Sequence, residues 1–417
     1  MYKHIITAAI LAGCTSAALS ADDSNTTVGG LVFLDVGHIS EQQNGKDIPP
    51  TGTGFDVKRA YLIVNHKFDD VWSANLTTDA QYLSAPSTIT STSATNNGVT
   101  TFTSTTNTNN SGGVTEIFIK RLYLQAKLDD AFVVDAGSYT SPWIGYLEQN
   151  LYEYRFVEKT ESDRFGYATT SDWGLNATGV VGDSGWIVYS ASVVNGGGFK
   201  NPTRTKGVDF EGSLGVKPAD WLAIGLGFYS GHLGQITATS ADFAKNTATR
   251  LDVAAGVHVG GFRLGAEYFN AKNYKAGNTS TGILSGPGGV VVATNVTPAL
   301  STGSVKSDKA DGFAGWTSYA FDAQWSIFAR YDRAKPSEDI TPNLKDTYFH
   351  LGVDYKPIKK VDIALVYKNE KVDNGAISIG SADGNGSYTI GGTGVAGTGV
   401  TTSGKFSEVG VYAQVAF

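Results

Sequence analysis

The chain has 417 residues, including 51 Gly, 20 Tyr and 20 Phe but one Met, one Cys and 11 Pro. This composition suits many short-turned β-strands better than helical cores, which favour Leu, Met and Ala. The formal net charge of −7 argues against a nucleic-acid partner, which requires a basic face.

Residues 1–20 have the pattern of a secretory signal peptide. Lys3 and His4 precede an apolar run, and small residues form the exit at Ala18-Leu19-Ser20. We therefore expect a mature chain of 21–417. Leu11-Ala12-Gly13-Cys14 also resembles a bacterial lipobox, and the sequence leaves open whether Cys14 is lipidated or removed. Because no Cys follows position 14, the folded body has neither a disulfide nor a Cys-ligated metal.

Beyond the signal, sixteen segments have the length and alternation of β-strands. No apolar run reaches the length of a membrane-spanning helix, which leaves spanning strands as the alternative to a secreted soluble protein. In chain order the predicted strands are Val28–His38, Phe55–Phe68, Trp72–Leu83, Glu116–Lys127, Phe132–Tyr139, Ser171–Val181, Trp186–Val194, Val208–Val216, Trp221–His232, Thr249–Val259, Phe262–Tyr274, Asp311–Tyr319, Trp325–Asp332, Asp346–Tyr355, Val361–Asn369 and Lys405–Phe417.

The connections between these strands strictly alternate between seven tight turns and eight long segments. Among the long ones we expect a polar loop around Pro49-Pro50 and a Thr/Ser/Asn-rich loop, Ser84–Val114, without a core of its own. Bacterial outer-membrane barrels have short periplasmic turns, long external loops and an even strand count. The pattern predicts an all-β fold: a 16-stranded antiparallel transmembrane β-barrel with both termini periplasmic.

Aromatic residues support this arrangement, because many of them flank the tight turns. They are Phe68, Trp72, Phe132, Trp186, Trp221, Phe262, Phe321 and Trp325. Such amphipathic rings are typical of a membrane interface, although aromatics are common in hairpins generally.

The last strand alternates between an apolar and a polar face. Val409, Val411 and Phe417 fall on one face, and Glu408 and Tyr412 on the other. This alternation predicts a strand with lipid on one side and water on the other, paired with the first strand to close the barrel.

A last strand of this kind, ending in Phe, resembles the assembly signal of Gram-negative outer-membrane proteins. Sixteen strands with a long third external connection resemble the trimeric porins. Residues 142–164 with Lys58-Arg59-Ala60-Tyr61-Leu62 and Lys120-Arg121-Leu122-Tyr123-Leu124 are similar to the phosphate-selective porin O and P family. The resemblance implies a homotrimer with three pores, an inward-folded third loop, and anion preference set by pore-lining Arg and Lys. This chain departs from the family pattern in being net acidic.

The connection 140–170 is aromatic and charged, and we expect it to fold inward and constrict the pore. Fixed charges in a narrow, low-dielectric passage act strongly on a passing ion. The candidate constriction residues are Glu148, Glu153, Arg155, Glu158, Lys159, Asp163 and Arg164. The candidate pore-wall residues are Arg59, Arg121, Arg263 and Arg330.

Two hypotheses compete for these charges. In the first, loop carboxylates face wall arginines across the pore and create a transverse field; in the second, the charges pair locally and hold the loop against the wall. Strict alternation would aim Lys58 and Lys120 at lipid, so we expect each either to reach an interface or to mark a shifted register.

The sequence therefore predicts an outer-membrane porin for passive diffusion of small hydrophilic solutes and inorganic ions. The alternatives are an anion- or phosphate-preferring porin, a non-conducting anchor or adhesin, and an outer-membrane hydrolase. The metalloprotease, phosphate-binding and nucleophile-elbow motifs do not occur, so we expect no enzyme activity, no cofactor and no metal site. The expected partners are outer-membrane lipid, lipopolysaccharide and two further copies of the chain.

Overall fold

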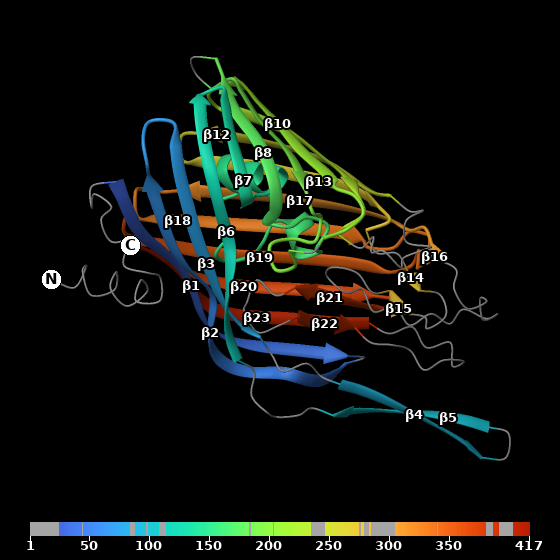
Figure 1. The fold of residues 1–417 in the computed structure, drawn as a ribbon. Coiled ribbons are helices and arrows are strands. Elements are labelled where there is room, and N and C mark those ends of the chain that lie inside the picture. The colour runs from blue at the N-terminus through green and yellow to red at the C-terminus, as the bar shows by residue number, and fades with distance from the viewer. Residues whose placement is uncertain are drawn as a thin grey trace.

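The computed structural model describes residues 25–43, 45–83, 88–96, 99–107, 114–182, 185–202, 204–234, 247–274, 277–278, 283–284, 305–339, 341–380, 387–391 and 403–417. Within these residues, sixteen strands form one closed antiparallel barrel (Figure 1). The first strand of the barrel pairs with the last from Leu31–Ala416 to Gln43–Gly404. The predicted fold class is confirmed. Because the sheet closes on itself, its wall has no exposed edge. The signal peptide expected at 1–20, with Cys14, lies outside the described residues.

The barrel strands lie in chain order around the wall. They are β1 (Thr26–Gln43), β2 (Lys46–Lys67), β3 (Trp72–Leu83), β6 (Val114–Asp129), β7 (Phe132–Thr140), β8 (Ser171–Val181), β9 (Ile187–Val194), β10 (Asp209–Ala219), β11 (Leu222–Gly231), β12 (Ala248–Val259), β13 (Phe262–Lys272), β17 (Lys309–Ala320), β18 (Trp325–Lys335), β19 (Lys345–Ile358), β20 (Val361–Asp373) and β23 (Ser403–Ala416). Short strands in the long connections are β4 (Thr88–Asn96), β5 (Val99–Asn107), β14 (Gly277–Asn278), β15 (Ile283–Leu284), β16 (Val305–Lys306), β21 (Ala376–Gly380) and β22 (Ser387–Gly391). No described helix is long and apolar enough to cross a membrane.

The faces of the wall follow the alternation predicted from the sequence. On β23, Val409 is 53% exposed on the outer face, whereas Glu408 and Tyr412 are buried inside the barrel. The aromatic residues predicted beside the tight turns are all exposed at that rim, including Trp186 and Trp221. An apolar outer surface with an aromatic rim is the pattern that a lipid bilayer requires of a barrel.

Two long connections differ from the prediction. The connection around Pro49-Pro50 is part of a hairpin, because β1 and β2 stay paired as far as Gln43 and Lys46. Where their register shifts, the Thr51 hydroxyl donates to the Glu41 carbonyl and accepts from the Glu41 N–H. Within Ser84–Val114, β4 and β5 form a two-stranded ribbon that projects from the barrel (Figure 1). Thr-rich segments favour extended backbone, and paired strands satisfy their backbone groups without a core.

Lys58 and Lys120 mark shifted registers, one of the two outcomes expected for them. The β1–β2 pairing passes from Phe33–Arg59 to Leu34–Val57 and skips Lys58. The β3–β6 pairing likewise skips Lys120. Each lysine is the extra residue of a β-bulge and is buried inside the barrel instead of facing lipid. At each of the two bulges, the Lys and the Arg that follows it therefore both point into the lumen.

Candidate functional site

Residues 140–170, here called the inner loop, run inside the barrel and contain helices α2 (Pro142–Asn150) and α3 (Glu161–Arg164). Pro142 occupies the first turn of α2, where a missing N–H costs no helical hydrogen bond. Figure 1 shows both helices within the ring of strands, and α2 contacts β9, β10 and β11. Most side chains of the inner loop are buried.

Glycines on the lumen face of the wall make room for α2. A Cβ on Gly215 or on Gly225 would lie 2.0 or 2.1 Å from the Tyr146 ring, and one on Gly227 would lie 2.5 Å from the Trp143 ring. These distances are too short for any side chain at the three positions. The Tyr146 hydroxyl also donates to the Ile224 carbonyl at 2.8 Å. The aromatic face of α2 therefore lies directly on the sheet backbone.

Cations on β12, β18 and β20 bind backbone carbonyls of the inner loop. Lys368 Nζ donates to the Val157 carbonyl at 2.8 Å. Arg330 donates to the Lys159 carbonyl, and Arg250 to the Tyr167 carbonyl. Irregular backbone inside a barrel needs such partners, because unpaired buried carbonyls are costly. These contacts hold the loop at points on three strands.

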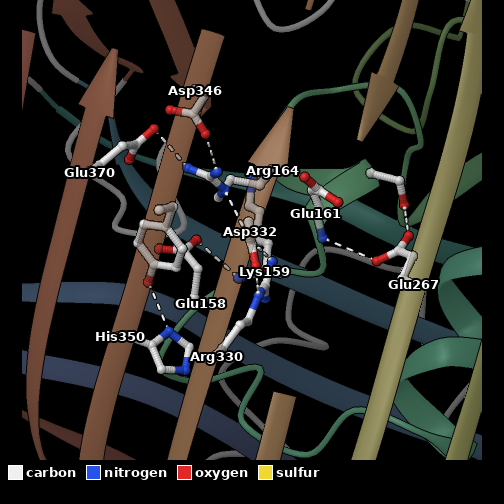
Figure 2. Close-up of polar contacts among 12 residues, drawn as sticks. Glu158, Lys159, Glu161, Arg164, Glu267, Arg330, Asp332, Asp346, His350 and Glu370 are labelled. Carbon is white, nitrogen blue, oxygen red and sulfur yellow. Dashed lines mark hydrogen bonds and ion pairs between the residues drawn. The ribbon is translucent and has the colours of Figure 1, made fainter. Parts of the chain in front are cut away.

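Arg164 is almost fully enclosed in the inner loop. Its guanidinium lies 2.8 Å from Asp346, 2.8 Å from Glu370 and 3.6 Å from Asp332, and it stacks over the Tyr348 ring at 4.5 Å. Figure 2 shows Arg164 pointing from the loop toward carboxylates of the wall. With a side chain 1% exposed, Arg164 fastens the loop and has little contact with pore water.

Glu267 on β13 holds the other side of α3. It accepts hydrogen bonds from Ser162 Oγ at 2.6 Å and from the Glu161 N–H at 3.3 Å (Figure 2). Burial raises the pKa of Glu161 well above its ordinary value, and the nearby Asp332 and Glu267 carboxylates raise it further. Burial and the two neighbouring carboxylates therefore disfavour the ionised form of Glu161 at this position.

Beside the inner loop lies a cavity of about 500 Å³. Its charged lining is mainly cationic, and the cations come from five separate parts of the chain. The cations are Arg59, Lys120, Arg155, Lys159, Arg164, Lys200 and Arg250, and the carboxylates are Asp79, Asp163, Asp172 and Glu211. On one side Asp79 pairs with Arg59 at 3.2 Å and with Lys120 at 3.9 Å. Lys120 Nζ also donates to the Tyr61 hydroxyl at 2.9 Å.

The loop charges predicted to face the pore divide into two groups. Arg155, Lys159, Asp163 and Arg164 line the cavity. Glu148 pairs with Arg155 at 2.5 Å, and Glu158 with Lys368 at 3.5 Å. Thus the loop contributes three cations and one carboxylate to the cavity lining, and two of these cations, Arg155 and Arg164, are themselves engaged in ion pairs. This differs from the predicted transverse field and matches the local-pairing hypothesis.

The predicted wall arginines also divide. Arg59 lines the cavity. Arg330 is buried behind the inner loop, where Asp332 binds it at 2.6 Å. Arg263, the second residue of β13, pairs with the loop residue Glu153 at 2.5 Å. Arg121 donates to Thr140 Oγ1 at 3.2 Å, where the loop begins. Alternation alone could not separate these positions, because all four side chains point inward and only the path of the loop distinguishes them.

Lys120, Lys200, Arg250 and Lys368 were not among the predicted site residues. Lys120 points into the lumen only because of its β-bulge, and alternation along the strand does not reveal a bulge. Arg250 alternates in phase with Asp252 and could have been found by that pattern. Lys200 follows three consecutive glycines in a connection that gave no sign of turning inward.

Burial within the barrel lowers the pKa of Lys159 to about 8, and Arg59 and Arg155 contribute in the same direction against the opposing effect of Asp163. Lys159 is therefore charged at neutral pH but close to titration. Together with the neighbouring Arg59 and Arg155, Lys159 provides positive charge that attracts anions from water.

The site thus consists of a closed barrel, an inner loop fastened to its wall and a cation-lined cavity beside that loop. The chain matches no protein-family model, and no curated protein is similar to it in sequence. Solved porin structures share its fold. The anion-selective porin from Comamonas acidovorans has a TM-score of 0.58 at 12% identity, over 94% of this chain and 99% of that one.

Two further structures have the same fold. OmpF of Salmonella typhi, in complex with daunomycin, has a TM-score of 0.54 at 11% identity, over 95% of this chain and 98% of that one. In-vitro folded OmpT, an outer membrane protein of Vibrio cholerae, has a TM-score of 0.53 at 12% identity, over 96% and 100%. At these identities the likeness concerns the fold. The resemblance to the phosphate-selective O and P family is not confirmed.

Proposed function

We propose that the protein is an outer-membrane porin through which small hydrophilic solutes and inorganic ions diffuse, with a preference for anions. The observation that carries the proposal is the cavity beside the inner loop, where cations from the wall and from the loop converge. The net charge of the chain is −7, but a passing ion responds to the nearest charges, since distant ones are screened within about 10 Å at 0.1 M salt. Local charge therefore outweighs net charge.

Several sequence-based expectations belong to the same proposal. Residues 1–20 are removed as a signal peptide, the tight turns and both termini face the periplasm, and the chain assembles as a homotrimer in contact with lipopolysaccharide. The barrel is a channel and not an enzyme. The expected oligomer can be tested by chemical cross-linking and by heat-modifiable bands in electrophoresis.

The test of the channel is a planar-bilayer recording in a salt gradient. We expect stepwise current and a reversal potential whose sign shows that anions permeate more readily than cations. A non-conducting anchor, adhesin or hydrolase would give no steps, and that result would overturn the proposal.

The variant Arg59→Glu is expected to move the reversal potential toward cations, because Arg59 lines the cavity. Arg121→Glu is a matched control: it is also an Arg beside a β-bulge, but it faces Thr140 and not the cavity. Lys159→Gln provides a milder change at the same site as Arg59. Equal shifts from Arg59→Glu and Arg121→Glu would show that the cavity is not the selective region.

A further inference from the structure

The connection after β9 also enters the barrel. Residues 196–201 line the cavity together with the inner loop. Their backbone is fastened to the start of β8: Phe199 N–H donates to the Ser171 carbonyl at 3.0 Å, and Trp173 Nε1 donates to the Phe199 carbonyl at 3.0 Å. The position of this segment is therefore set by the wall, as that of the inner loop is.

Glycine makes this path possible. Gly196 and Gly198 have φ values of +83° and +73°, which residues with a side chain rarely adopt. A Cβ on Gly196 would lie 1.7 Å from the Asp209 carboxylate. The backbone N–H groups of both glycines face the carboxylate of Asp172. The turn thus directs the chain inward and delivers the next side chains to the cavity.

Lys200 is the cation that this turn places at the cavity. Its side chain is exposed to the water of the cavity, and its ammonium lies 4.3 Å from the centre of the Phe118 ring. Phe118 precedes Lys120 by two residues on β6, toward the end of the strand that bears the long connection. A solute that enters the barrel from the long-connection end therefore meets Lys200 before Lys120 and Arg59.

We propose that Lys200 is a specificity-determining residue of the pore, which draws small anions from the long-connection side toward Arg59, Lys120 and Lys159. This inference rests on the proposed channel function and deepens it. Arg59, Lys159 and Lys120 surround Lys200, with Asp79 as the opposing charge. The barrel wall removes part of the bulk water around the Lys200 ammonium, and this effect, with Arg59 and the two lysines, lowers the pKa of Lys200 to about 8, so it carries its charge at neutral pH.

The first test compares Lys200→Gln and Lys200→Glu with Lys206→Glu. Lys206 lies on the same connection, is exposed and does not line the cavity. A unit charge about 5 Å from a passing ion changes its Boltzmann weight about fourfold in water. The chloride-to-potassium permeability ratio is therefore expected to fall about fourfold or more in Lys200→Gln, to fall further in Lys200→Glu, and to stay unchanged in Lys206→Glu.

The second test is chemical accessibility during a recording. The one Cys in the sequence, Cys14, precedes the folded body, so Lys200→Cys and Lys206→Cys each place a single thiol there. A negatively charged methanethiosulfonate reagent is expected to reduce the current through the Lys200→Cys channel and to leave that of Lys206→Cys unchanged.

The outcomes separate this inference from the proposed function. Absence of stepwise current in the unaltered protein would refute the channel itself. An anion-selective channel whose permeability ratio is the same in Lys200→Gln as in the unaltered protein would refute the role of Lys200 alone. Lys200→Gln places an uncharged polar side chain at an exposed position, so it remains informative even if Lys200→Glu fails to assemble.

Discussion

Replacing Arg164 by Ala removes the cation that three wall carboxylates share. Arg164 bonds Asp346 and Glu370 at 2.8 Å each and lies 3.6 Å from Asp332. With the inner loop still in place, these carboxylates would remain buried with a cavity where the guanidinium had been. With the loop displaced, pore water would hydrate them. The substitution therefore destabilises the loop in its position against the wall relative to a loop displaced from it.

The magnitude follows from the burial. Removing one partner of a buried ion pair costs about 3–5 kcal/mol. Since 1.4 kcal/mol corresponds to a factor of ten, the ratio of displaced to seated loop would rise by about two to almost four orders of magnitude. Pairing between the strands closes the barrel without the Arg164 side chain, so the barrel itself is expected to assemble.

The assay is single-channel recording together with limited proteolysis of the inner loop. Arg164→Ala is expected to show larger, noisier conductance and faster cleavage within 140–170. Arg333→Ala is the matched control, because Arg333 adjoins Asp332 on β18 but is exposed on the opposite face. If Arg164→Ala kept the conductance, the noise and the cleavage rate of the unaltered protein, the anchoring role of Arg164 would be refuted.

Three further predictions concern the same region. Anion preference is expected to fall between about pH 7 and pH 9, because Lys159 and Lys200, with pKa values of about 8, are charged below that pH and neutral above it; a reversal potential independent of pH over this range would contradict the assignment. Asp79→Asn is expected to increase anion preference, because it removes the carboxylate that pairs with Arg59 at 3.2 Å, and a shift toward cations in the same recording would count against it. Gly225→Leu is expected to displace α2, since its Cβ would lie 2.1 Å from the Tyr146 ring, at an overpacking cost of about 1–3 kcal/mol; unchanged conductance would show that α2 does not narrow the passage.

Strand number, strand order and the two faces of the wall could be predicted from the sequence. Alternation along a strand is local: Glu408 and Val409 must point to opposite sides because successive side chains do so in any extended chain. The alternation of tight and long connections likewise fixes which strands are neighbours in an up-and-down barrel. That residues 140–170 would fold inward was suggested by their composition and by the family resemblance.

What the sequence alone determined is therefore the barrel, and what only the tertiary structure decided is which of its inward charges meet water. Arg59 and Arg330 have the same pattern in the sequence, yet Arg59 lines the cavity, whereas Arg330 lies behind the inner loop and is bound by Asp332. The bulge at Lys120 and the inward turn before Lys200 depend on pairing with distant strands, β3 and β8. Alternation is a property of a single strand, whereas a pore surface is formed by many strands and loops together, so its charge is settled only when they are packed.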